Sequence, residues 1–187
     1  MSTNDIVLKI CSIGSFSVGK TSLIRRFADW KFSTNYLPTI GVDYTIKRIA
    51  LNDKLVKLLL ADTAGQEVFG KIRSSYYLGS LGCLVVFALN DRKSFNAVPH
   101  WIKEFRNTVN PQSIVVLVGN KNDLINERVI SSEDAQSMAK EYDVSYYETS
   151  ALWGGREIIE IFHTLASNIL NLIKKPSTTI SAQHKVV

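Results

Sequence analysis

The chain has 187 residues, of which 45% are hydrophobic and 21% are charged, and its formal net charge is +5. This length and composition suit one globular domain with a substantial core. The longest apolar runs are far shorter than the roughly 20 residues that span a bilayer, and Lys and Arg are scattered, which argues against a membrane-spanning or a nucleic-acid-binding protein.

The N-terminus is polar and lacks the pattern of a signal peptide, and Ser2 stands where myristoylation requires glycine. The two cysteines, Cys11 and Cys83, lie inside apolar segments, without the spacing of a disulfide framework or a metal site. We therefore expect a cytoplasmic protein with two buried free thiols.

Apolar segments alternate with amphipathic ones, which predicts an α/β fold with a mainly parallel sheet. Strands are expected at residues 6–13, 41–51, 56–61, 83–89, 114–118 and 144–147. Residues 41–51 alternate polar and apolar side chains and meet the next strand through Asn52-Asp53, a turn of the hairpin type. This pair is therefore expected to be antiparallel and to lie at a sheet edge.

Helices are expected at residues 20–29, 71–78, 94–106, 132–141 and 156–174. The last of these has apolar residues at three-to-four spacing, which marks a stripe that faces the core, although a helix lying on a membrane would show the same stripe. The folded domain is expected over residues 1–176. A disordered tail is expected over residues 177–187, because this polar segment has nothing to pack against.

Residues 14–21 read Gly-Ser-Phe-Ser-Val-Gly-Lys-Thr and lie between the first strand and the first helix. This is the G-x-x-x-x-G-K-[ST] pattern in the context that phosphate binding requires. Backbone N–H groups of the loop can surround phosphates, Lys20 adds a positive charge, and the Thr21 hydroxyl can bind Mg²⁺. The alternative is a flexible turn before a helix.

Asn120-Lys121-Asn122-Asp123 follows an apolar strand, so these side chains emerge where open α/β sheets bind ligands. The Asp123 carboxylate can accept two hydrogen bonds from guanine, whereas adenine offers no such pair of donors. At about 1.5–3 kcal/mol per bond, the preference for guanine is roughly 10² to 10⁵. The segment alone could be a polar turn; together with residues 14–21, it predicts a GTP/GDP site.

In order and spacing, five segments resemble the motifs of the Ras superfamily of small GTPases: residues 14–21, 38–41, 62–67, 120–123 and 149–151. The resemblance extends over about residues 6–174. Residues 40–44, 74–77 and 101–105 look most like the Rab branch, which regulates vesicle traffic. The resemblance implies a three-layer P-loop NTPase fold with a six-stranded, mostly parallel sheet, one antiparallel edge strand and about five helices.

The resemblance also implies roles for individual residues. Gln66 would orient the attacking water, with Lys20 and Thr39 as the other catalytic residues, and Thr21, Thr39 and Asp62 would hold Mg²⁺. The expected nucleotide-binding residues are Ser15, Phe16, Ser17, Val18, Gly19, Lys20, Thr21, Ser22, Phe32, Tyr36, Thr39, Gly65, Asn120, Lys121, Asp123, Ser150, Ala151 and Leu152.

Phe32 matches the aromatic residue that lies against guanine, although the residue alone could equally be a packing residue. Effectors, an exchange factor and a GTPase-activating protein would bind residues 33–44 and 63–78, the two segments that would switch with the nucleotide. The chain is expected to be a monomer. A nucleoside kinase would share the phosphate loop but would leave residues 62–67 and 120–123 unexplained.

Four features depart from the Rab pattern. Phe16 replaces a small residue beside the expected catalytic centre, which predicts slow hydrolysis and leaves a GTP-loaded binding scaffold as the alternative function. Leu152 replaces a lysine that covers guanine. Ala61 replaces an effector-reading tryptophan, whereas Tyr44 and Tyr76 fit the other two effector-reading aromatics.

The fourth departure is that the sequence ends without the cysteine that prenylation requires. Either the sequence is shortened, or attachment to the cytosolic face of endomembranes is absent or indirect.

Overall fold

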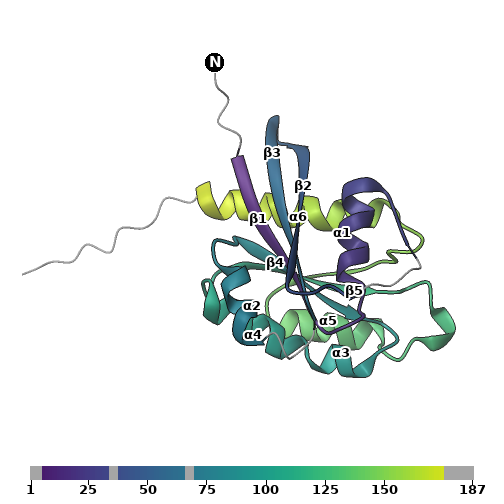
Figure 1. The fold of residues 1–187 in the computed structure, drawn as a ribbon. Helices are drawn as coiled ribbons and strands as arrows, with labels where there is room; N and C mark the ends of the chain where they lie inside the picture. Colours follow the sequence, from purple (N-terminus) through teal and green to yellow (C-terminus); the bar gives the residue numbers. More distant parts are fainter. Residues whose placement is uncertain (1–5, 34–37, 66–69, 175–187) are drawn as a thin grey trace, which may run out of the picture.

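Six strands form one sheet in the order β2-β3-β1-β4-β5-β6 (Figure 1). The computed structural model describes residues 6–33, 38–65 and 70–174. The strands are β1 (Ile6–Ile13), β2 (Val42–Leu51), β3 (Lys54–Thr63), β4 (Gly82–Ala88), β5 (Ile114–Asn120) and β6 (Ser145–Glu148). All neighbouring pairs are parallel except β2 and β3, which are antiparallel at one edge. The predicted fold class is confirmed.

Helices cover both faces of this sheet and give the molecule three layers (Figure 1). The helices α1 (Lys20–Asp29) and α6 (Arg156–Lys174) contribute buried side chains to one core. The other core takes side chains from α2 (Gly70–Tyr77), α3 (Arg92–Asn96), α4 (Val98–Thr108) and α5 (Ser132–Glu141). A short 3₁₀ helix, η2 (Ile125–Glu127), follows β5.

The central strands are buried on both faces, as expected for a parallel sheet between two helical layers. Every residue of β4 is buried. The rings of Phe27 and Phe162 stack with their centroids 4.0 Å apart and join α1 to α6. The apolar stripe of α6 packs into this core. Among the described residues, no helix combines the length and the apolar character that crossing a membrane requires.

The β2–β3 hairpin sets the relative position of the two segments expected to switch. Its turn residues, Asn52 and Asp53, have φ angles of 51° and 59°, as a two-residue turn of type I′ requires. At the other end of the hairpin, Val42 pairs with Thr63, and the Ala64 N–H donates to the Gly41 carbonyl at 2.9 Å. The chain therefore leaves β3 directly beside the point where it enters β2.

The helix expected over residues 94–106 is divided into α3 and α4. The Asp91 carboxylate caps α3 by accepting the N–H groups of Lys93 and Ser94, so the helical region starts earlier than expected. Pro99 lies in the first turn of α4, where its missing N–H costs nothing; inside a continuous helix it would break the hydrogen-bond ladder. The helices expected at residues 20–29, 132–141 and 156–174 have the predicted bounds.

Candidate nucleotide site

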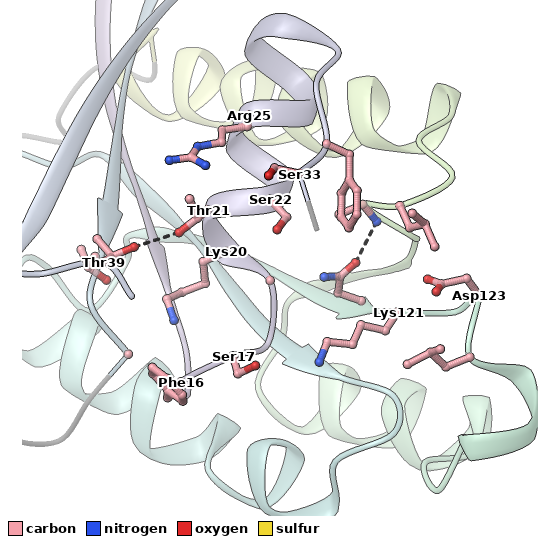
Figure 2. A pocket seen from close by; sticks show the side chains of 18 residues that line it. Phe16, Ser17, Lys20, Thr21, Ser22, Arg25, Ser33, Thr39, Lys121 and Asp123 are labelled. Carbon is pink, nitrogen blue, oxygen red and sulfur yellow. Dashed lines mark hydrogen bonds between the residues drawn. The ribbon is translucent and has the colours of Figure 1, made fainter. Parts of the chain in front are cut away.

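A pocket of about 350 Å³ lies where β1, β3, β5 and β6 reach their carboxyl ends. Its lining combines the loop after β1, the start of α1 and the residues that follow β3, β5 and β6. The lining residues are Phe16, Ser17, Gly19, Lys20, Thr21, Ser22, Arg25, Phe32, Ser33, Thr39, Thr63, Gly65, Asn120, Lys121, Asp123, Leu124, Ala151 and Leu152. In Figure 2, Thr39 lies at one end and Asp123 at the other.

The loop over residues 14–19 holds a buried positive charge. Lys20 is only 6% exposed, and its ammonium donates to the carbonyls of Gly14 and Ser15 at 3.0 and 2.8 Å. Gly19 has φ of 97°, and a Cβ there would lie 2.2 Å from Asn120 Nδ2, so only glycine fits this turn. Burial of a cation is costly without partners. The two carbonyls offset part of this cost, and an anion bound in the pocket would offset more.

Three oxygen-bearing side chains meet beside this charge. Thr21 Oγ1 donates to Asp62 Oδ2 at 2.5 Å and lies 2.9 Å from Thr39 Oγ1 (Figure 2). Asp62 is 4% exposed, and its Oδ1 is a buried atom with no hydrogen-bond partner within the described ranges 6–33, 38–65 and 70–174. Burial raises the pKa of the Asp62 carboxyl, against the hydrogen bonds from Thr21 and Thr39 and the charge of Lys20. This set of hard oxygen donors with one unpartnered carboxylate oxygen fits Mg²⁺.

The opposite end of the pocket is built from hydrogen bonds within the protein. Asn120, which is 1% exposed, donates from Nδ2 to the Val18 carbonyl at 2.8 Å and accepts the Ala151 N–H at 3.1 Å. Ser150 Oγ donates to Asp123 Oδ1 at 2.5 Å. These bonds connect the end of β5 to the phosphate loop and to the loop after β6. The Asp123 carboxylate is held in place through its Oδ1 atom.

Gly65 brings the end of β3 against the phosphate loop. A Cβ at this position would lie 2.4 Å from Lys20 Nζ and 2.6 Å from the Ser15 carbonyl carbon, so the backbone can approach only without a side chain. Phe16 is next in this loop, lines the pocket and is 42% exposed. Phe16, a bulky aromatic residue, therefore lines the same pocket as Gly65, the residue before Gln66.

The structure brings most of the predicted nucleotide-binding residues to one pocket. Three predicted nucleotide-binding residues, Ser15, Val18 and Ser150, and the predicted metal ligand Asp62 are not among its lining residues; each supports a lining residue through a bond described above. Tyr36, Gln66 and the tail at 177–187 lie outside the described residues. The sequence prediction missed Arg25, Ser33, Thr63 and Leu124. Arg25 lies four residues after Thr21 on α1, so helical spacing was a usable signal for it.

Comparison with known proteins places this chain in a family. Residues 9–171 match the model of the Ras family. The Ras-related protein Rab11A of Lotus japonicus is 36% identical over 92% of this chain and 76% of its own length. Rab-1D of Dictyostelium discoideum is 41% identical over 90% and 82%, and SEC4 of Saccharomyces cerevisiae 39% identical over 88% and 76%.

The pocket and the sheet define a P-loop nucleotide-binding protein, and the comparisons specify it further: the chain belongs to the Ras family. It is a small GTPase whose relatives include Rab proteins, as its motifs predicted.

Proposed function

We propose that this chain binds GTP and GDP with Mg²⁺ and hydrolyses GTP as a nucleotide-dependent switch in vesicle or membrane traffic. The observation that carries the proposal is the polarity of the pocket. One end holds the buried Lys20 ammonium beside the Asp62 oxygen cluster, and the other end holds the Asp123 carboxylate. A guanine nucleotide has the matching order of charge, with phosphates at one end and hydrogen-bond donors on its base at the other.

At the phosphate end, Lys20 and the loop N–H groups would hold the phosphates, and Thr21, Thr39 and Asp62 would hold the metal ion. When bound, Mg²⁺ neutralises charge on the phosphate oxygens. Thr39 and Gly65 line the pocket and belong to the two segments that border the β2–β3 hairpin, which supports a response of both segments to the terminal phosphate. The role of Gln66 in orienting water remains a prediction from the family motif.

The partner surface would differ from that of typical Rab proteins. Tyr44 is 46% exposed, and Tyr76 approaches Gly41, where an added Cβ would lie 3.3 Å from its hydroxyl. Ala61, in contrast, is completely buried. Effectors that require a large aromatic side chain at this position would find none, so we expect this chain to select effectors by other contacts.

The principal experiment measures nucleotide preference with the full chain. Bound nucleotide is extracted and identified by chromatography, and fluorescent GDP is then competed with GDP or ADP, with and without Mg²⁺. We expect GDP to compete at least about 100-fold better than ADP, and Mg²⁺ to slow its release. Equal competition by ADP, or no uptake of either nucleotide, would refute the proposal.

A second function, a GTP-loaded binding scaffold, is favoured by one observation: Phe16, a bulky aromatic residue, lines the same pocket as Gly65. Single-turnover hydrolysis by the native protein and by Phe16→Gly distinguishes the two functions. If the ring crowds the reacting phosphate, Phe16→Gly should hydrolyse GTP about tenfold faster or more, a difference of about 1.4 kcal/mol in the barrier. Equal rates would show that Phe16 does not limit turnover.

A further inference from the structure

An arginine outside the predicted site connects three segments around the base end of the pocket. From α1, Arg26 donates Nε–H to the Ala151 carbonyl at 2.9 Å and an Nη2 hydrogen to the Leu152 carbonyl at 2.8 Å. Its Nη1 donates to the Trp30 carbonyl at 2.9 Å. The guanidinium carbon also lies 5.8 Å from the centre of the Phe32 ring, within the range of a cation–π contact.

These contacts hold the pocket wall from its outer side. Ala151 and Leu152 both line the pocket. The backbone of Ala151 is held on both sides, because its N–H donates to Asn120 Oδ1 and its carbonyl accepts from Arg26 Nε. Bonds from Nε and Nη2 to two successive carbonyls use the rigid planar fork of arginine, which the single ammonium of lysine cannot reproduce.

The loop after β6 is shaped to pass closely around this side chain. Gly154 has φ of 72°, and a Cβ there would lie 3.2 Å from Arg26 Cδ. The Gly154 N–H donates to the Ser150 carbonyl, and Ser150 Oγ donates to Asp123. A continuous set of contacts therefore runs from Asp123 through the loop to Arg26 and on to Phe32.

We propose that Arg26 is a positioning residue for the guanine base, and that it slows nucleotide release by holding the wall at residues 151–152 and the Phe32 ring in place. The inference rests on the proposed function, because it assigns Arg26 a part in the same site. Without the fork, two carbonyls lose their charged donor and the wall opens more often, so the base leaves faster.

The test follows release of fluorescent GDP from the full chain into excess unlabelled GDP with Mg²⁺ present. Arg26→Ala and Arg26→Lys should both release GDP about tenfold faster or more, since each loses at least one charge-assisted bond. Gly154→Ala, which pushes on the arginine stem, should also accelerate release. Arg156→Ala is the matched control, because Arg156 is 89% exposed and makes one ion pair at 4.0 Å; its rate should be native.

A chelation experiment separates positioning from general loosening of the fold. Mg²⁺ removal acts at the phosphate end, and effects at distant independent sites add in free energy. Chelation should therefore accelerate release by the same factor in the native protein and in Arg26→Ala. If chelation accelerates release by a much smaller factor in Arg26→Ala than in the native protein, and the variant also unfolds at a lower temperature, the inference is overturned.

Native release rates in both Arg26 variants would also overturn it and would leave the proposed function intact. Failure of the native protein to bind GDP would instead refute the proposed function.

Discussion

The two ends of the pocket differ in how their polar groups are satisfied. At the base end, Asn120 and Ser150 bond to neighbouring protein groups, so the shape of that end is fixed by the protein itself. At the phosphate end, three oxygen-bearing groups crowd together, and Asp62 keeps a buried oxygen with no hydrogen-bond partner among the residues that the structure describes. The comparison teaches that the Asp123 end of the pocket is shaped by bonds within the fold, whereas the Lys20 end keeps charged groups that a ligand could satisfy.

The largest expected effect comes from the carboxylate that would read the base. Asp123→Asn replaces one of the two carboxylate oxygens by an NH₂ group, which is a hydrogen-bond donor. Guanine should therefore lose one hydrogen bond and face one repulsive contact between two donors. We expect GDP affinity to fall by about 100-fold or more, and the affinity for xanthosine diphosphate, which carries a carbonyl at that position, to rise. Competition binding measures both. Asp53→Asn, in the hairpin turn, is the isosteric control, and a parallel loss of both nucleotides would contradict base reading.

Asp62→Asn tests the phosphate end. The substitution keeps the size of the side chain but removes the negative charge, so Mg²⁺ should bind more weakly and contribute less to nucleotide retention. We expect the factor by which chelation accelerates GDP release to be about tenfold smaller in the variant than in the native protein. The same Asp53→Asn control applies. An unchanged chelation factor would show that Asp62 does not hold the ion.

A smaller effect is expected from the residue that connects the end of β6 to the segment at the start of α5. Glu148, the last residue of β6, accepts hydrogen bonds from both Nη atoms of Arg128 and from the Tyr146 hydroxyl at 2.7 Å, and from Ser132 at 2.9 Å. Glu148→Gln should destabilise the protein by about 2 kcal/mol at pH 7, or roughly 4–8 °C in unfolding temperature. Glu160→Gln is the control, because Glu160 is exposed and its ion pair with Arg156 is long, at 4.0 Å.

The pH dependence of this effect has a definite sign. The hydrogen bond from Arg128 is the main cause that lowers the pKa of Glu148 in the folded protein below its ordinary value of 4.5. The stabilisation is therefore complete above about pH 4.5 and is lost as the pH falls through the lower folded value. The difference between native and Glu148→Gln unfolding temperatures should shrink in acid. A difference that is constant with pH would exclude the charged carboxylate as its source.

Local signals explain which parts of the structure the sequence predicts well. The helix at Ser132–Glu141 begins at an N-cap serine, whose side chain accepts the Asp134 N–H, and is followed by acidic residues that favour its dipole. The division between α3 and α4 was missed because the apolar pattern continues through Pro99, and the cap at Asp91 was not recognised. The short helix η2 has too few residues to show a period.

The same reasoning applies to the candidate site. The phosphate loop is a single contiguous motif, so the sequence alone indicates it. Arg26 is different: its bonds to Ala151 and Leu152 join residues more than a hundred positions apart, and no local pattern records that α1 ends beside the loop after β6. Long-range contacts of this kind become visible only in the folded chain.

The hydrogen bond between Ala64 and Gly41 at the open end of the β2–β3 hairpin has a mechanical consequence. It links the backbone just after Thr39 to the backbone just before Gln66, so a displacement of one strand end is transmitted to the other through this bond. A partner protein that binds only one of the two strand ends would therefore respond to the conformation of both.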